Sequence, residues 1–211
     1  MTKNILIILL SGLTIFACAQ NKNAEQLLEE VNNHIQSYDA LSIDFSYSIE
    51  FPDDGSRENG QGKLDVSGDK YRLKIIGQHV YSNGKTMWTY ITDAEEVQIN
   101  SVTEDNGMIT PTNLLTFYKK KYKARSLKEE IMNDTPVYVV ELKPEEDKNI
   151  SKVNLYIDKD QKLIRKLTLH DQNGGTTTYT LDEYEMNPPL TEKDFIFNTE
   201  QHPDVEIIDM R

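Results

Sequence analysis

One stretch of this chain constrains its fold more than any other: the strict alternation of apolar and polar residues from Ile43 to Phe51. Isoleucine, phenylalanine or tyrosine occupies every second position, and aspartate, serine or glutamate lies between them. Because successive side chains of a strand point to opposite faces of the sheet, this run predicts a strand with one apolar and one wetted face. Such a strand is typical of an antiparallel sheet.

Turn signals and further apolar runs extend this strand into a meander. Asn83-Gly84 lies between two apolar runs and predicts a hairpin with a type I′ turn, in which both residues have positive φ angles. Trp88 and Tyr90 follow the turn and share one face of their strand, since they are two residues apart. We expect further strands at residues 62–66, 70–76, 96–102, 137–142, 152–158, 163–170 and 176–184.

Three segments have helical signals instead. Residues 24–35 carry apolar side chains at helical spacing. Thr110-Pro111 is a standard helix opening, because threonine caps a helix and proline is tolerated at its first position. Residues 190–195 predict one helical turn with a threonine cap. No internal repeat or interdomain linker separates these segments, so we expect a single domain.

The N-terminus predicts export. Lys3 precedes an apolar stretch over residues 5–16, which is too short for a membrane-spanning helix, and Ala17-Cys18-Ala19 offers a signal-peptidase site. We therefore expect a signal peptide over residues 1–19 and a mature chain over residues 20–211 in the periplasm of a Gram-negative bacterium. The alternative is cleavage before Cys18 and attachment of a lipid anchor to that cysteine.

Composition excludes several classes of function. The formal net charge of −12 opposes nucleic-acid binding, which needs basic surface. Cys18 is the only cysteine, and the four histidines are scattered, so no metal site is expected. The sequence contains no nucleophile motif, phosphate-binding loop or dinucleotide fingerprint, so we expect no catalytic residue, no cofactor and no enzymatic activity.

Several motifs resemble those of the periplasmic outer-membrane lipoprotein carrier (LolA) family, and they occur in the family's order. Residues 82–90 are similar to its D-G-K-T-x-W-x-Y signature, and residues 60–64 to its G-x-G-x-L segment. The other matches are Tyr38-x-x-Leu41-Ser42-x-Asp44-Phe45, Thr110-Pro111 with Leu114-Leu115, Phe195-x-Phe197 and the closing run Pro203 to Arg211. The resemblance covers essentially the whole mature chain.

The resemblance implies a fold and a function. The fold is a mostly β (α+β) domain in which a curved antiparallel sheet forms an incomplete β-barrel, with a few lid helices over a hydrophobic cavity. From the pattern alone, a packed core is the more usual outcome. The implied function is a soluble carrier that binds the acyl chains of lipoproteins. It takes them from an inner-membrane ABC-type transporter to an outer-membrane acceptor. An anchored acceptor or a lipid-binding sensor of the same fold is the alternative. We expect a monomer.

The resemblance also selects candidate residues, each of which could equally be ordinary core. The cavity candidates from the sheet are Phe45, Tyr47, Ile49, Leu64, Val66, Trp88 and Tyr90, and the lid candidates are Leu27, Leu28, Val31, Leu114, Leu115, Phe117 and Tyr118. A basic run either docks onto an acidic patch of a transporter or onto lipid headgroups, or is a solvated helix end. It consists of Lys119, Lys120 and Lys121, with Lys123, Arg125 and Lys128.

One departure from the family pattern concerns gating. Well-studied carriers have an arginine in the loop after the second strand, where it contributes to lid closure. Here Val66 is followed by Ser67-Gly68-Asp69, and Arg72 lies within the next predicted strand. We therefore assign the role of that arginine in lid closure to no residue of this chain.

Overall fold

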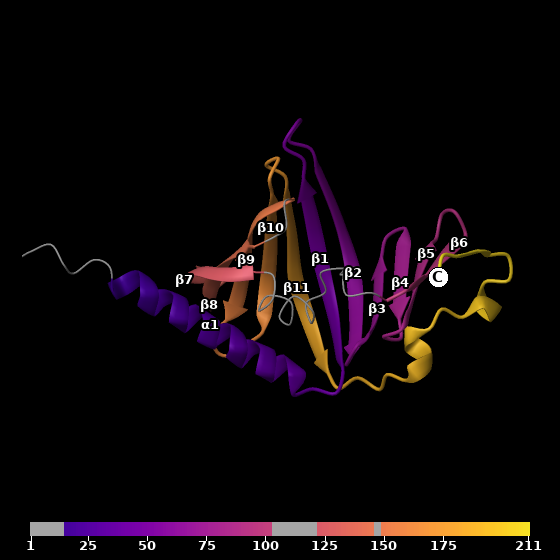
Figure 1. Ribbon diagram of the computed structural model, residues 1–211, viewed down its shortest axis with the longest axis horizontal. Coiled ribbons are helices and arrows are strands. Elements are labelled where there is room, and N and C mark those ends of the chain that lie inside the picture. Colours follow the sequence, from indigo (N-terminus) through magenta and orange to yellow (C-terminus); the bar gives the residue numbers. More distant parts are fainter. Residues whose placement is uncertain (1–14, 103–121, 146–148) are drawn as a thin grey trace, which may run out of the picture.

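The computed structural model describes residues 15–102, 122–145 and 149–211, with side chains from Ala24 onward (Figure 1). One α-helix, α1 (Ile15–Gln36), precedes the strands. The strands are β1 (Leu41–Glu50), β2 (Arg57–Ser67), β3 (Lys70–Ile75), β4 (Gln78–Ser82), β5 (Thr86–Ile91), β6 (Glu96–Ser101), β7 (Tyr122–Met132), β8 (Thr135–Pro144), β9 (Ile150–Asp158), β10 (Ile164–Asp171), β11 (Thr176–Met186) and β12 (Glu206–Asp209). Two short 3₁₀ helices, η1 (Glu192–Phe195) and η2 (Thr199–Gln201), lie between β11 and β12.

All the described strands belong to one sheet, with the order β12-β6-β5-β4-β3-β2-β1-β11-β10-β9-β8-β7. Neighbouring strands are antiparallel except for β12, which runs parallel to β6. The sheet is large and curved, and its described strands do not close into a barrel, since β12 and β7 lie at opposite edges (Figure 1). The prediction of a mostly β fold built on a curved, incompletely closed antiparallel sheet is confirmed.

The strand with the strict alternation, β1, lies at the centre of the sheet. It pairs with β2 on one side and with β11 on the other, so that Phe45 lies opposite Gly62 and Leu181. The pairing with β11 has a bulge at Asp182. Residues opposite one another in a sheet share a face. The bulge therefore keeps Tyr184 and Leu181 on the same face despite their odd spacing.

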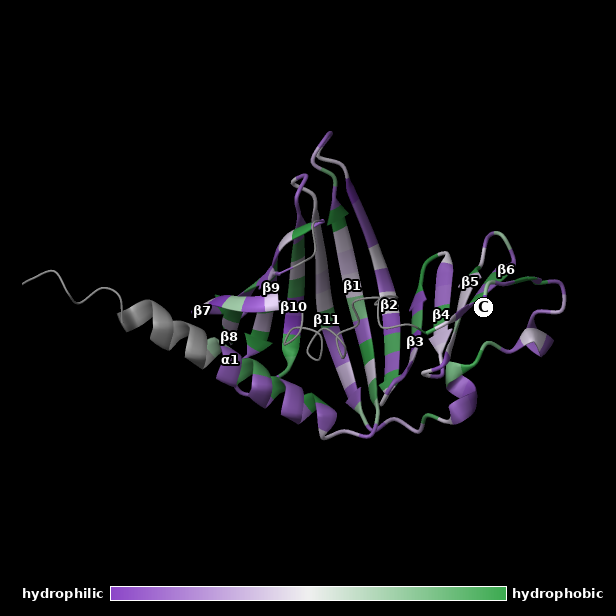
Figure 2. Ribbon diagram, viewed as in Figure 1, coloured by the Kyte–Doolittle hydropathy of each residue, from purple (hydrophilic) through white to green (hydrophobic). Residues whose placement is uncertain are grey.

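The two faces of the sheet have different coverings. We call the face that carries Ile43, Phe45 and Tyr47 the inner face, and the other the outer face. Buried side chains of α1, including Leu28 and Val31, belong to the same apolar cluster as the inner-face residues. Hydrophobic and hydrophilic bands alternate along α1 and β2, as expected for elements with one buried side (Figure 2). The helix thus covers part of the inner face and packs chiefly beside β7.

The C-terminal segment from η1 to β12 covers part of the outer face. Phe197, in this segment, contacts Tyr81 and Tyr90 of β4 and β5, with ring centroids 5.8 and 5.2 Å apart. The predicted helical turn at residues 190–195 is confirmed as η1, and Thr191 caps it together with Asp194. The segment ends by adding β12 to the edge strand β6 (Figure 1).

Two local predictions differ from the structure. The turn at residues 83–84 is not of type I′, because φ is positive at Gly84 (85°) but not at Asn83. The Asn83 side chain closes the turn instead, with its Oδ1 accepting hydrogen bonds from the backbone N–H groups of Lys85 (3.0 Å) and Thr86 (2.8 Å). Positive φ angles at two consecutive residues do occur at Asn133 and Asp134, in the tight turn between β7 and β8.

The other difference concerns the basic residues after position 121. Lys123, Arg125 and Lys128 lie in β7, so this part of the basic run is a strand and not a helix end. Lys119, Lys120 and Lys121 themselves lie outside the described residues, as do the lid candidates Leu114, Leu115, Phe117 and Tyr118.

Candidate functional site

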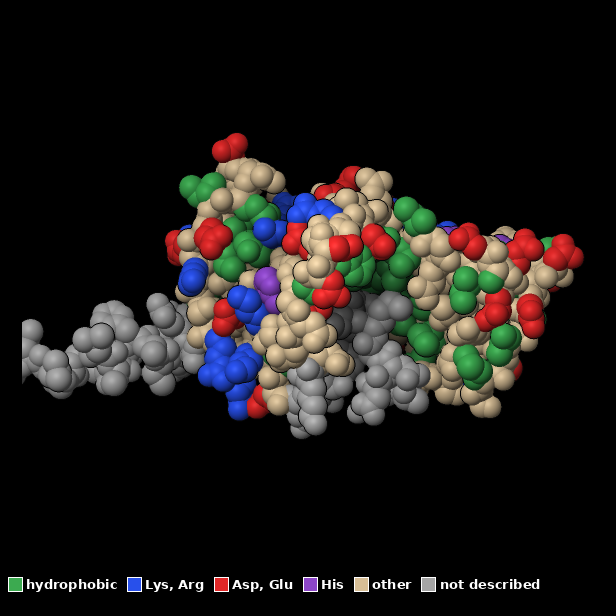
Figure 3. Space-filling view, turned by 90° about the horizontal axis from the view of Figure 1, so that it is seen from above, with side chains coloured by type: hydrophobic (Ala, Val, Ile, Leu, Met, Phe, Trp, Pro, Cys, Tyr) green, Lys and Arg blue, Asp and Glu red, His purple; other side chains and the backbone are tan. Residues whose placement is uncertain are grey.

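The inner face changes from covered to open along β1. Leu41, Ile43 and Phe45 are buried, whereas the residues from Ser46 to Glu50 are all half-buried. Apolar side chains of β1, β3 and β11 on this open part pack against the core cluster yet stay partly accessible: Tyr47, Tyr71, Leu73, Ile75 and Tyr179. In Figure 3 apolar side chains accordingly reach the surface in the middle of the molecule.

A contiguous apolar surface that stays partly open to water is unusual for a monomeric domain. Such surfaces mark places where a ligand, a membrane or another protein binds. The lining here is aliphatic and aromatic, so it suits a ligand that is itself apolar. The inner face of β1, with the facing parts of β2, β3 and β11, is therefore the candidate binding surface.

Three aromatic rings form the centre of this surface. The centroids of Phe45, Tyr47 and Tyr179 lie 6.0 to 6.4 Å from one another, within the range of favourable aromatic contacts. Burial raises the pKa of the Tyr179 hydroxyl, and the neighbouring Tyr47 adds to the effect. Tyr179 thus stays neutral at physiological pH and gives the surface no charge.

Most of the candidates taken from the first two strands lie together. Phe45, Leu64 and Val66 belong to the main apolar cluster, and Tyr47 packs against it. Ile49 lies on the same face, since it alternates with Ser48. The helix candidates Leu27, Leu28 and Val31 are buried in that cluster and form part of the core.

Trp88 and Tyr90 do not lie on this surface, which corrects the prediction made for them. Trp88 pairs with Tyr81 across β4 and β5, whereas the inner-face residue Leu73 pairs with Val80. Because Val80 and Tyr81 are adjacent, Trp88 and Tyr90 face the outer side. They belong to a second apolar cluster with Val97 and Phe197, beneath the C-terminal segment. Trp88 and Tyr90 do share one face of their strand, as predicted, but it is the outer face of the sheet.

Four residues of the binding surface were missed. Tyr71, Leu73 and Ile75 on β3 alternate as clearly as the residues of β1, and this pattern was sufficient to place them on one face of the sheet. Tyr179 on β11 also alternates with its neighbours. However, its position beside Tyr47 depends on the pairing of β1 with β11, which no local pattern reveals.

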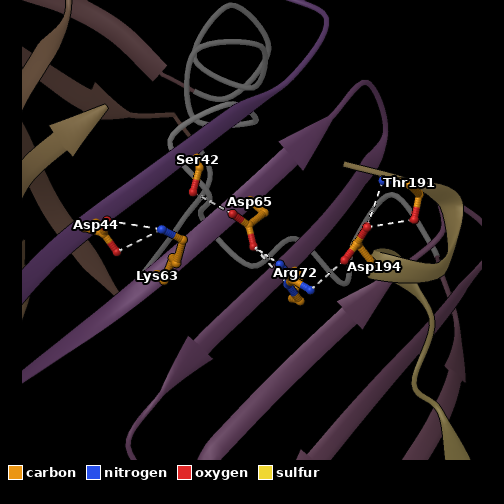
Figure 4. A network of polar contacts seen from close by, with 7 residues as sticks. All are labelled: Ser42, Asp44, Lys63, Asp65, Arg72, Thr191 and Asp194. Carbon is orange, nitrogen blue, oxygen red and sulfur yellow. Dashed lines mark hydrogen bonds and ion pairs between the residues drawn. The ribbon is translucent and has the colours of Figure 1, made fainter. Parts of the chain in front are cut away.

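The outer face opposite this surface carries a polar network (Figure 4). Asp65 is 2% exposed and accepts hydrogen bonds from Ser42 Oγ (2.7 Å) and Arg72 Nε (2.8 Å). Arg72 Nη1 also donates to Asp194 of η1 at 3.1 Å. Hydrogen bonds from the backbone and hydroxyl of Thr191, followed by the charge of Arg72, lower the pKa of Asp194. Arg72 therefore ties the C-terminal segment to the outer face and does not reach the inner face.

The part of the chain that the structure describes contains neither a candidate metal cluster nor a membrane-spanning helix. Among its side chains, no group of three His, Cys, Asp or Glu residues is placed to hold a metal ion. Within the same residues, no helix is long and apolar enough to cross a membrane.

The curved sheet recurs in solved structures of other proteins. An uncharacterized conserved protein from Thermus thermophilus has this fold with a TM-score of 0.60 and 10% identity, covering 89% of this chain and 99% of that chain. The lipoprotein LppX of Mycobacterium tuberculosis is similar with a TM-score of 0.51 and 10% identity, over 81% of this chain and 98% of that chain. A LolA superfamily protein from Nitrosomonas europaea matches with a TM-score of 0.45 and 14% identity, over 82% and 97%.

The family itself follows from the amino-acid sequence. The chain belongs to the outer membrane lipoprotein carrier protein LolA family, whose sequence model matches residues 36–198. No protein with a curated description matches the chain. Membership of the family implies that the chain binds lipids or lipoproteins.

Proposed function

We propose that this chain is a periplasmic carrier that holds the acyl chains of lipoproteins against the inner face of its sheet. The observation that carries the proposal is the run of apolar side chains on the open half of that face, which the core leaves partly accessible. Family membership supports a lipid or lipoprotein as the ligand.

The energetics suit a carrier. Each buried acyl CH₂ contributes about 0.8 kcal/mol, so a lipoprotein with several acyl chains cannot cross water unshielded. The carrier must also release its cargo, which favours a surface that is partly open over a sealed cavity. Binding and release make or break no covalent bond, so the proposal includes no enzymatic activity.

Family membership supports the proposed route. The carrier takes lipoproteins from an inner-membrane ABC-type transporter and delivers them as a monomer to an outer-membrane acceptor. The net charge of −12 supports this role, because an acidic protein is repelled by anionic lipid and does not remain on membrane surfaces.

The test measures the binding of a synthetic triacylated lipopeptide to the mature chain. The readout is displacement of a fluorescent apolar probe. The variant Tyr47→Asp places a charge on the inner surface, and the matched control Ser46→Asp places one on the outer face of the same strand. We expect Tyr47→Asp to weaken binding more than about tenfold, because a carboxylate is costly in apolar surroundings, and Ser46→Asp to leave it unchanged. A wild-type chain that does not bind the lipopeptide would overturn the proposal.

A second candidate is an anchored acceptor or lipid-binding sensor of the same fold, carrying a different lipid. Cys18 supports it, since acylation of that residue would tether the chain to a membrane. LppX, which has the same fold, is itself described as a lipoprotein. The mass of the mature N-terminus separates the candidates. A chain that begins at Gln20 supports the soluble carrier, and a lipid-modified Cys18 supports the anchored protein.

A further inference from the structure

Two glycines face the binding surface from β2. Gly60 lies opposite Tyr47 and Gly62 lies opposite Phe45 in the pairing of β1 with β2. Both positions are in the interior of a strand, where glycine weakens the sheet because it has no side chain to pack and much chain entropy to lose. Neither residue has a positive φ angle, so the backbone conformation does not require glycine there.

The space above the two glycines is filled by the aromatic rings of β1. A Cβ atom at Gly60 would overlap Cζ, Cε1 and the hydroxyl oxygen of Tyr47. A Cβ atom at Gly62 would lie 2.5 Å from Cζ of Phe45 and 2.8 Å from the backbone oxygen of Lys74. The rings of Phe45 and Tyr47 thus lie across β2 in the places where its side chains would stand, an arrangement in which a cross-strand aromatic ring covers a glycine.

The position of each ring affects the room above the sheet. A ring that leans over a glycine rises less from the sheet than a ring that stands upright and projects into the space where a ligand would bind. Phe45 and Tyr179 lie on either side of the Tyr47 ring, at 6.4 and 6.3 Å between ring centroids, and limit its sideways movement. If the place above Gly60 were filled, the ring of Tyr47 would therefore move away from the sheet.

We infer that Gly60 and Gly62 determine the depth of the acyl-binding surface by letting the rings of Tyr47 and Phe45 lean across β2 into the space above them. The inference rests on the proposed function and assigns a specificity-determining role to two residues that do not themselves contact the ligand. It predicts that the glycines control how long an acyl chain the surface accommodates.

The two positions differ in how well they can be tested. At Gly60 the three atoms nearest to an added Cβ all belong to the far end of the Tyr47 side chain, which can rotate away. At Gly62 it also meets the backbone of β3, so Gly62→Ala is expected to destabilise the sheet itself. Gly60→Ala is therefore the informative variant. Gln61→Ala is its matched control, since Gln61 lies between the glycines and faces the outer side.

The experiment measures the binding of saturated fatty acids of increasing length, from decanoic to stearic acid, to the mature chain. The readout is displacement of a fluorescent apolar probe. For Gly60→Ala we expect little change for the shortest acid and about a tenfold loss for the longest, the effect of about two methylene groups losing their burial. Gln61→Ala is expected to keep the wild-type dependence on length.

Two further variants test the inference without relying on Gly60→Ala alone. Leucine is too short to reach the positions of the Tyr47 atoms that a Cβ at Gly60 would overlap, so Gly60→Ala combined with Tyr47→Leu is expected to restore long-chain binding. Tyr47→Leu alone is expected to favour the longest acids, because it deepens the surface.

The outcomes separate this inference from the proposed function. A wild-type chain that binds none of the acids would overturn both. A wild-type chain that binds them, together with a Gly60→Ala variant of unchanged length dependence, would overturn the inference and leave the carrier proposal intact. An equal loss for all lengths, or the absence of rescue in the double variant, would also count against it.

Discussion

At β1, β2 and β3, the two faces of the sheet differ in the kind of side chain that they carry and in how far those side chains are covered. The inner face presents apolar side chains that remain partly accessible, such as Tyr47 and Leu73. The outer face buries a carboxylate, Asp65, within a network of hydrogen bonds that Arg72 extends to the C-terminal segment. The difference indicates that the interactions of the outer face stabilise the fold. The inner face can therefore keep apolar surface accessible to a ligand.

The largest effect is expected from Arg72→Met. This variant leaves the carboxylate of Asp65 buried without its cation, a change that costs about 3–5 kcal/mol of unfolding free energy. Urea denaturation of the mature chain measures it. The control is Lys63→Met, whose partner Asp44 is half exposed and whose loss should cost less than about 1 kcal/mol. Similar losses in the two variants would contradict a special role for the buried network.

A smaller and more selective effect is expected from two aromatic substitutions. Trp88→Ser removes a ring from the outer cluster around Phe197, so it should lower stability by about 1–3 kcal/mol without changing lipopeptide affinity. Tyr47→Ser removes a ring from the inner surface, so it should lower affinity more than stability. Isothermal titration calorimetry and urea denaturation on both variants check this. If Trp88→Ser weakened binding as much as Tyr47→Ser, the assignment of the two faces would be wrong.

The smallest expected effect is the change of folding stability with pH. Burial, followed by the charges of Lys74 and His202, lowers the pKa of His79 on the outer face from its ordinary value of 6.5. The unfolded chain therefore binds a proton at higher pH than the folded chain, and stability falls as the pH drops below about 6.5. His170 has a pKa lowered in the same direction and adds to the decline.

Urea midpoints measured between about pH 8 and pH 5 report this decline. His79→Gln cannot titrate, so its midpoint should fall less than that of the wild type over the same range. On the inner surface, the hydroxyl of Tyr179 stays neutral over this range, because burial raises its pKa. Lipopeptide affinity should accordingly stay constant across the range, and a parallel fall in affinity would show that the two faces are coupled.

Local patterns predicted much of the fold. The alternation of β1 identified an antiparallel strand with one apolar face, and similar runs placed most of the other strands. Strand β7 was missed because its charged residues, including Lys123 and Lys128, resemble a solvated run and give no apolar stripe. Strand β12 was also missed, because it forms by parallel pairing with β6 and no turn signal in the sequence predicts that pairing.

The candidate site was harder to predict than the fold. Phe45 and Tyr47 were assigned correctly to one surface because they share a strand and its alternation. The face of Trp88 could not be inferred in this way, because it depends on the pairings through β3 and β4. The apolar cluster that Trp88 joins is completed by Phe197, a residue far away in the sequence, so a large aromatic residue on β5 does not show which side it faces. The bulge at Asp182 likewise has no signal in the sequence.

The pairing at the centre of the sheet has a consequence for how the chain is made. Strand β1 lies beside β11, and Leu41 is paired with Met186. The sheet therefore cannot be completed until nearly the whole polypeptide has been synthesised, and contacts between such distant residues form slowly. We expect the nascent chain to complete its sheet later than a chain built only from local hairpins. A protein that must pass through a narrow translocation channel before it folds gains from this delay. The topology that shapes the binding surface thus also suits the export predicted from residues 1–19.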